Sequence, residues 1–323
     1  METPLIILHI SDVLESNGDP VNPVNIMKYL DSFGIGDCEF ESALNYLIAE
    51  RYLTRPDKGV FSLTDSGRDQ VSTFSIKDNE DKYNSFMLRL WNSRAYLDFC
   101  EDLYGYRWCL LNSLYREQLQ YLFNELKISP GDMVLDIGCG SGAIINNLVD
   151  RYACRGIGID FAHDLIAILR KHYSDIAFYD MAIESIHRAP FDADVFISLD
   201  SLYFCRNLAT TFAGIKSKCR SRMYVFYTQS VEDKNGNRDG LHSDNTDIAK
   251  ALRLNDFSYS ATDFSHDEWN LWKKEKKILD KHRSAFEKEG NLSIWDGRVA
   301  DTNNMLKEYG DKRAKRFLYR IEV

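Results

Sequence analysis

A glycine-rich turn between an apolar strand and an amphipathic helix is the feature that most constrains the fold of this sequence. An apolar run at 133–137 predicts a buried strand, GCGSG at 138–142 follows it, and residues 143–152 carry apolar side chains at helical spacing. Glycines in such a turn let backbone N–H groups approach a ligand closely, at the positive end of the helix. The sequence therefore predicts an α/β domain with a ligand site at this turn.

Two carboxylates near the turn distinguish between two kinds of ligand. Asp160 ends the next predicted strand, where an acid can hold a ribose diol through two hydrogen bonds. The loop also fits the G-x-G-x-x-A pattern of dinucleotide-binding domains, through Gly138, Gly140 and Ala143. Asp136 would repel a pyrophosphate, but it suits a ligand with an ammonium group. S-adenosylmethionine has an ammonium group, a sulfonium cation and no phosphate, so the pattern favours it over NAD.

VLDIGCGSG followed by GIGID resembles the first two motifs of the class I S-adenosylmethionine-dependent methyltransferases. In the order of strands and motifs, the resemblance covers residues 128–323. It implies a Rossmann-like α/β fold with a mostly parallel seven-stranded sheet whose last strand is antiparallel. We expect a helical insertion at about 240–295 within this domain.

The resemblance also implies which residues contact the cofactor. Asp160 would hold the ribose, Phe161 would pack on the adenine, and Asp180 would accept a hydrogen bond from the adenine amine. The segment 104–108 resembles one that closes over the methionine moiety. The residues assigned to the cofactor in this way are Tyr104, Tyr106, Asp136, Gly138, Gly140, Asp160, Phe161, Asp180, Met181 and Asp200.

Polar residues after the fourth and fifth predicted strands indicate where a methyl acceptor would bind, because ligands of open α/β sheets bind at the carboxyl ends of strands. We expect Asp200, Tyr203 and His242 to act on the acceptor, with Tyr227 and Gln229 nearby. His242 lies in a polar loop and is equally well explained as a solvated side chain. No metal is expected, since Asp200 has no acidic neighbour close to it in the sequence.

The first 75 residues are predicted to form a separate, mainly α-helical domain. Three helical segments precede YLTRPDKGVFSL, whose alternation of apolar and polar residues around a Pro/Gly turn predicts a hairpin. This order resembles a winged helix. Five basic against twelve acidic residues up to Val71 disfavour contact with nucleic acid, because each phosphate contact needs a cation. We therefore expect a dimerisation or capping domain, joined by an aromatic-rich helical linker at 76–127 that contributes to the active site.

Composition and charge narrow the function further. The chain has 323 residues, a net charge of −9 and seven scattered cysteines, which suggest reduced thiols in a cytoplasmic protein. No apolar run reaches the roughly 18 to 20 residues that a membrane span needs. We expect a homodimeric enzyme that methylates a nitrogen or oxygen of a small molecule.

Two other functions stay open at this point. One is an S-adenosylmethionine-sensing regulator that binds DNA, and the other is an RNA or protein methyltransferase. Small-molecule O-methyltransferases usually carry a catalytic histidine after the fifth strand, where this sequence has Thr228-Gln229-Ser230. This departure leaves nitrogen and oxygen equally open as the methylated atom.

Overall fold

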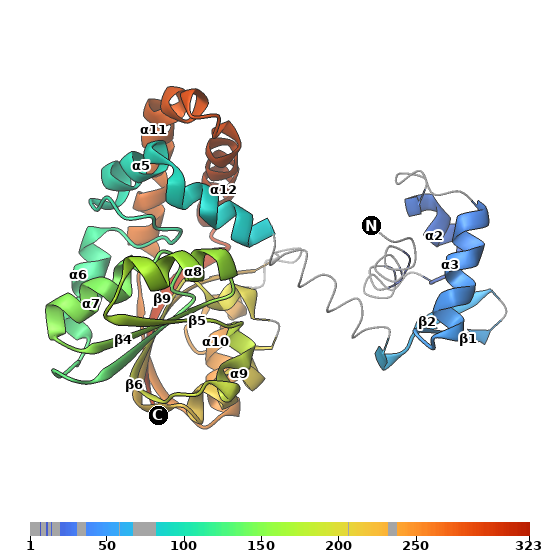
Figure 1. Cartoon of the computed structure of the whole chain (residues 1–323), viewed down its shortest axis with the longest axis horizontal. Coiled ribbons are helices and arrows are strands. Elements are labelled where there is room, and N and C mark those ends of the chain that lie inside the picture. The colour runs from blue at the N-terminus through green and yellow to red at the C-terminus, as the bar shows by residue number, and fades with distance from the viewer. Residues whose placement is uncertain are drawn as a thin grey trace. The chain divides into compact units, whose positions relative to one another are not determined.

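The computed structural model describes residues 7, 11, 14, 20–30, 37–57, 59–66, 82–205, 207–231 and 238–323. The chain divides into two compact units, Met1–Lys82 and Tyr83–Val323 (Figure 1). The predicted boundary near residue 75 lies outside the described residues. In the described part of the chain, every helix is too short or too polar to span a membrane.

The first unit contains two described helices and a β-hairpin. These elements are α2 (Pro23–Leu30), α3 (Asp37–Ala49), β1 (Leu53–Asp57) and β2 (Val60–Leu63). The antiparallel pairing of β1 and β2 confirms the predicted hairpin. The first predicted helix, at about 5–14, lies almost entirely outside the described residues, so the winged-helix assignment stays a prediction.

The second unit is built on a seven-stranded sheet with the order β5-β4-β3-β6-β7-β9-β8. The strands β3 to β7 pair in parallel. β8 and β9 follow them in the chain and complete one edge of the sheet, where β9 pairs antiparallel with both β7 and β8. This topology confirms the predicted Rossmann-like sheet. The strands are β3 (Met133–Ile137), β4 (Arg155–Asp160), β5 (Ile176–Asp180), β6 (Ala193–Leu199), β7 (Cys219–Ser230), β8 (Ser258–Asp263) and β9 (Ala314–Glu322).

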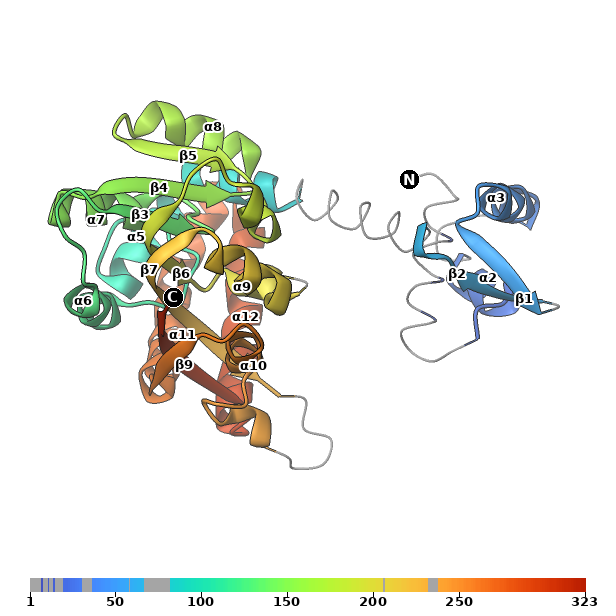
Figure 2. The same cartoon turned by 90° about the horizontal axis from the view of Figure 1, so that it is seen from below.

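Helices cover both faces of this sheet, because alternate side chains of a strand point to opposite faces (Figures 1 and 2). Val134 and Val195 belong to the apolar core on the side of α5 to α8, and Leu135 and Phe196 to the core on the side of α9 and α10. The helices on the two faces are α5 (Arg94–Tyr104), α6 (Arg116–Glu125), α7 (Ala143–Tyr152), α8 (His163–His172), α9 (Leu208–Lys216) and α10 (Asp247–Leu254).

Two long helices, α11 (Ser265–Lys288) and α12 (Leu292–Gly310), come between β8 and β9 in the sequence. They lie side by side in the structure. The sequence predicts one helical insertion at about 240–295. In the structure, β8 divides the helices of this region, and the helical part continues to Gly310. This strand pairs with β9 and separates α10 from α11. Figure 1 shows α11 and α12 rising together with α5 beyond one edge of the sheet.

The glycine turn lies between β3 and α7, as predicted, and brings its backbone against the segment that follows β6. Gly138 has a φ of 71°, in the left-handed region that favours glycine. A Cβ at Gly138 would lie 2.3 Å from the Cβ of Ser201. Ser201 in turn donates a hydrogen bond to the carbonyl oxygen of Ile137. The turn can therefore pack against this segment only with glycine at position 138.

Substitution Gly138→Ala is expected to lower stability and to deform the turn. Gly131→Ala is its matched control, because Gly131 also has a positive φ of 86° but nothing lies within 4 Å of the added Cβ. The control should cost about 1 kcal/mol of backbone strain, while Gly138→Ala adds a steric cost of roughly 1 to 3 kcal/mol. Urea denaturation of both variants measures the difference. Equal losses would show that the contact with Ser201 relaxes freely.

Candidate functional site

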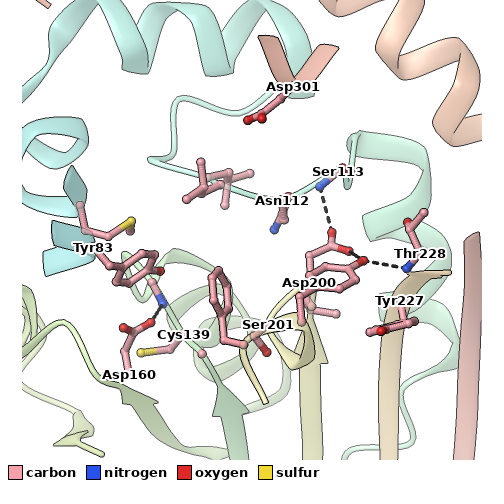
Figure 3. A pocket seen from close by; sticks show the side chains of 18 of the residues that line it. Tyr83, Asn112, Ser113, Cys139, Asp160, Asp200, Ser201, Tyr227, Thr228 and Asp301 are labelled. Carbon is pink, nitrogen blue, oxygen red and sulfur yellow. Dashed lines mark hydrogen bonds between the residues drawn. The ribbon is translucent and has the colours of Figure 1, made fainter. Parts of the chain in front are cut away.

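A cavity of about 680 Å³ lies where the carboxyl ends of β3, β4 and β6 meet. Its walls come from five parts of the second unit: the strand ends, the helical residues 83–92, the loop 109–113, α11 and α12. Figure 3 shows Asp160 and Cys139 on the strand side of the cavity and Asp301 on the helix opposite. The cavity therefore joins the glycine turn to the residues predicted to bind an acceptor.

Asp160 holds the glycine turn from the end of the neighbouring strand. Its Oδ2 accepts a hydrogen bond from the backbone N–H of Gly140 at 2.9 Å, and its Oδ1 accepts one from Ala162 at 3.0 Å. The side chain is buried, and this burial raises the pKa of the carboxyl above its usual value. Each oxygen has a further lone pair with which it can accept a hydrogen bond from a ligand hydroxyl.

Asp136 is a buried carboxyl group that lines the cavity without a hydrogen bond from any described residue. Burial, helped by the nearby Asp160, raises the pKa of Asp136 to about 8. At neutral pH the group is therefore mostly protonated as long as no cation lies beside it. A cationic group placed beside it would favour the carboxylate and release the proton.

Three aromatic rings form an apolar wall next to Asp160. The ring centroid of Tyr83 lies 4.6 Å from that of Phe161 and 5.7 Å from that of Phe204. All three residues line the cavity. Phe161 is a predicted cofactor residue, whereas Tyr83, in a helical segment 55 residues before the glycine turn, was not predicted. Its aromatic side chain is the one signal in the sequence that could have pointed to it.

Asp200 is held by a buried arginine from the far end of the chain. Its two carboxylate oxygens accept hydrogen bonds from Nη1 and Nη2 of Arg316, at 2.7 and 2.8 Å. Arg316 is fully buried. The carboxylate also accepts a hydrogen bond from the backbone N–H of Ser113 at 2.9 Å, and Asp200 itself has a left-handed φ of 61°. These contacts hold the segment after β6 in one conformation.

Arg316 also connects Asp200 to a second buried carboxylate. Its Nη1 lies 3.6 Å from Oε1 of Glu268 and donates a hydrogen bond to the hydroxyl of Thr228. Glu268 Oε2 accepts hydrogen bonds from Thr228 and from Tyr309. The acidic neighbour of Asp200 is thus 68 positions away in the sequence, and an inspection of adjacent residues cannot find it. Burial raises the pKa of Glu268, while the charge of Arg316 lowers it in part.

The hydroxyl of Tyr203 is fully occupied by the protein. It donates a hydrogen bond to Oδ1 of Asp200 at 3.0 Å and accepts one from the backbone N–H of Thr228 at 2.7 Å. Burial raises the pKa of Tyr203 well above its usual value. Its ring is stacked on Tyr227, and the residue as a whole is 42% exposed and lines the cavity. Tyr203 therefore presents an aromatic surface to the cavity rather than a proton-transfer group.

Several predicted site residues lie outside the cavity lining. Tyr104 is buried and donates a hydrogen bond to the carbonyl oxygen of Asn112, so it supports the 109–113 loop from behind. Tyr106 is stacked on Trp108. Asp180 ends β5 opposite Asp160, and Met181 follows it, its backbone N–H donating to the carbonyl oxygen of Asp160.

His242 is also outside the cavity lining, with 68% of its side chain exposed and Asp244 as its nearest acid at 3.9 Å. The predicted residues that do line the cavity are Asp136, Gly138, Gly140, Asp160, Phe161, Asp200, Tyr203, Tyr227 and Gln229. Among the described residues, no group of three or more His, Cys, Asp or Glu side chains is placed to hold a metal ion.

Comparison with known sequences assigns the central part of the second unit. Residues 134–221, which run from β3 into β7, match the sequence model of a family described as a methyltransferase domain. The chain carries a methyltransferase domain. No curated protein matches the sequence.

Solved structures share the fold of this methyltransferase domain at low sequence identity. Phosphoethanolamine N-methyltransferase 2 of Haemonchus contortus has a TM-score of 0.56 and 12% identity over 71% of this chain. This chain spans 57% of the length of that protein. The cyclopropane synthase MmaA2 of Mycobacterium tuberculosis has a TM-score of 0.56 and 13% identity, over 72% of this chain and 95% of that one. These likenesses establish the fold of the second unit.

A putative sarcosine dimethylglycine methyltransferase of Galdieria sulphuraria has a TM-score of 0.54 and 12% identity. The aligned parts are 64% of this chain and 85% of that one. The fold is thus shared by proteins named for different reactions, and the acceptor of this methyltransferase domain has to be argued from its own cavity.

Loss of the Arg316 cation is expected to destabilise the domain strongly. Arg316→Met leaves Asp200 and Glu268 buried without their counter-ion, which should cost about 3 to 5 kcal/mol. Lys315→Met, on the same strand, removes a cation whose pair with Asp263 is 44% exposed on both sides, and it should cost less than about 1 kcal/mol. Chemical denaturation of both variants tests this, and similar midpoints would contradict a structural role for Arg316.

Proposed function

We propose that this methyltransferase domain moves the methyl group of S-adenosylmethionine to a nitrogen or oxygen of a small-molecule acceptor. The observation that carries this proposal is the single cavity that joins the glycine turn, Asp136 and Asp160 to the polar residues around Asp200. One end of the cavity suits an amino acid and a ribose, and the other end is open to a second ligand. A dinucleotide suits it less, because Asp136 lies where a pyrophosphate would come close to the turn.

The residues of the cavity fit S-adenosylmethionine group by group. The Asp136 carboxylate would face the ammonium group, and the free lone pairs of Asp160 would accept from the ribose hydroxyls. Phe161, Tyr83 and Phe204 offer an apolar wall for the adenine, with Asp180 and Met181 beside it at the end of β5. When bound, the cofactor supplies a methyl group activated by its sulfonium.

The task of the protein is to hold the acceptor in line with that methyl group and to exclude water. Well-oriented reactants can account for about 7 to 11 kcal/mol of a reaction barrier. Asp200 and Tyr203 are suited to this role, because Arg316, Ser113 and Thr228 fix their positions. α11 and α12 form the wall opposite the strands and shield the cavity. His242 has no place in this mechanism, since its side chain lies outside the cavity.

For the first unit, the proposal rests on the sequence alone. Its excess of acidic residues favours dimerisation or capping of the site over binding of DNA. A homodimer located in the cytoplasm stays a prediction, to be tested by measuring the mass of the purified protein in solution and by locating it in cells.

The purified full chain is expected to bind S-adenosylhomocysteine and not NAD. Asp160→Asn should weaken that binding by about 1.5 to 3 kcal/mol, the range for hydrogen bonds to a charged group. Asp175→Asn is the matched control, because Asp175 lies just before β5, at the opposite end of that strand from the cavity. Calorimetric titration measures all three proteins. Binding of NAD alone would contradict the proposed cofactor, and equal affinities of the two variants would remove Asp160 from the site.

Binding of S-adenosylhomocysteine at pH 7 is expected to release between about half a proton and one proton. The pKa of about 8 keeps Asp136 mostly protonated before the ligand binds, and an ammonium group alongside would lower that pKa by about 1 to 3. The binding enthalpy should therefore depend on the ionisation enthalpy of the buffer, as a comparison of phosphate with Tris reveals. Asp136→Asn should abolish this dependence. Proton release that persists in the variant would place its source elsewhere.

A further inference from the structure

We propose that the methyl acceptor is a small amine that enters the cavity as an ammonium ion and is methylated at that nitrogen. This inference rests on the proposed function, and it names the substrate class. It is carried by the charges and the aromatic surface around Asp200, which no comparison assigns.

The acceptor side of the cavity offers no available cation among the described residues that line it. Arg298 is the basic residue of this lining, and Glu275 already neutralises it. Its Nη2 and Nε lie 2.6 and 2.8 Å from Oε1 of Glu275, and both side chains are buried. Arg316 lies behind the lining and is shared by Asp200 and Glu268. A phosphate or carboxylate on the acceptor would therefore meet no positive charge free to pair with it.

Carboxylates, in contrast, are in excess on the same side. Asp200, Glu268 and Asp301 line it, with only the Arg316 cation between the first two. Glu268 is 1% exposed, and its Oε1 accepts no hydrogen bond from a described residue. Asp301 has no hydrogen bond or ion pair within the described part of the chain, and Figure 3 shows it opposite the strand ends. An ammonium group would supply donors to both and reduce the excess negative charge.

The aromatic surface points to the same kind of ligand. Tyr203 lines the cavity as an exposed residue, and its ring is stacked on Tyr227, while its hydroxyl is bound to Asp200 and Thr228. Trp272, which is 6% exposed, is a further aromatic side chain of the lining. Ring faces attract cations, because the electron density above and below an aromatic ring is negative. This observation is independent of the carboxylates.

The reaction balances without a further reactant. The ammonium group first gives up one proton, which passes through water to the solvent at the exposed Asp301. The nitrogen lone pair then forms a bond to the methyl carbon as the bond from that carbon to sulfur breaks, and its electrons stay on sulfur. The products are a methylated ammonium ion and a neutral thioether. The acidic lining holds a positively charged nitrogen both before and after the transfer.

The test compares small ligands that share a similar carbon skeleton and differ in their charged or polar group. The full chain, saturated with S-adenosylhomocysteine, is titrated with 2-phenylethylamine, 2-phenylethanol and 3-phenylpropionate, and with ethanolamine against phosphoethanolamine. Methyl transfer from S-adenosylmethionine to the same compounds is measured by release of S-adenosylhomocysteine. At least one of the two phosphate-free amines should bind about tenfold or more tightly than its anionic counterpart and should be methylated at nitrogen. Binding of the anionic member at equal or higher affinity, or binding of neither amine, would overturn the inference.

Two variants locate the charge that is responsible. Asp301→Asn should raise the KM of the amine about tenfold with little change in affinity for S-adenosylhomocysteine. Asp296→Asn removes the same charge from an exposed position of α12 outside the cavity lining, and it should leave the KM unchanged. Equal effects of the two variants on the KM would show that Asp301 acts only through the net charge of the protein and does not contact the amine. If S-adenosylhomocysteine itself fails to bind, the proposed function is wrong, whichever amine binds.

Discussion

The guanidinium group of Arg316 is the contact on which the acceptor side of the cavity depends. It is fully buried, bonds both oxygens of Asp200 and lies beside Glu268, so that one cation serves two carboxylates in an apolar surrounding. A charge in this position costs several kcal/mol unless it is paired, and this cost forces the three side chains together. Their pairing in turn fixes the conformation after β6 and the hydroxyl of Tyr203.

The sheet supplies the frame for this contact. Parallel strands direct their carboxyl ends to one edge, so the turn after β3, Asp160 and Asp200 meet although up to 62 positions separate them in the sequence. β7 extends beyond β6 and pairs with β9, and this register places Arg316 opposite Thr228. The antiparallel strand therefore supplies the cation as well as closing the sheet.

The cavity combines two kinds of electrostatic environment. At one end lies the buried carboxyl group of Asp136, which has a pKa of about 8 and can pair with a positively charged group of a ligand. Around Glu268 and Asp301, the negative charge exceeds the available cations, and aromatic rings lie alongside. Both ends are suited to ligands that carry positive charge. This property distinguishes the cavity from sites that recognise phosphate through arginine or lysine.

The amino-acid sequence by itself predicted the strand at 133–137, the turn at 138–142 and the acid that ends the next strand, because these features are local: apolar runs, glycines and adjacent residues. The seven-stranded sheet was implied by the resemblance of these motifs to a known family. The sequence did not determine the partners of Asp200, since Arg316 and Glu268 come from segments whose only connection to it is the folded sheet. It also could not separate His242, in an exposed loop, from the residues of the cavity. Tyr104 and Tyr203 were expected at the site by position, but the direction of their hydroxyl groups depends on neighbours brought by other elements. Tertiary structure decided these points, because the cost of burying a charge is settled by which groups are close in space.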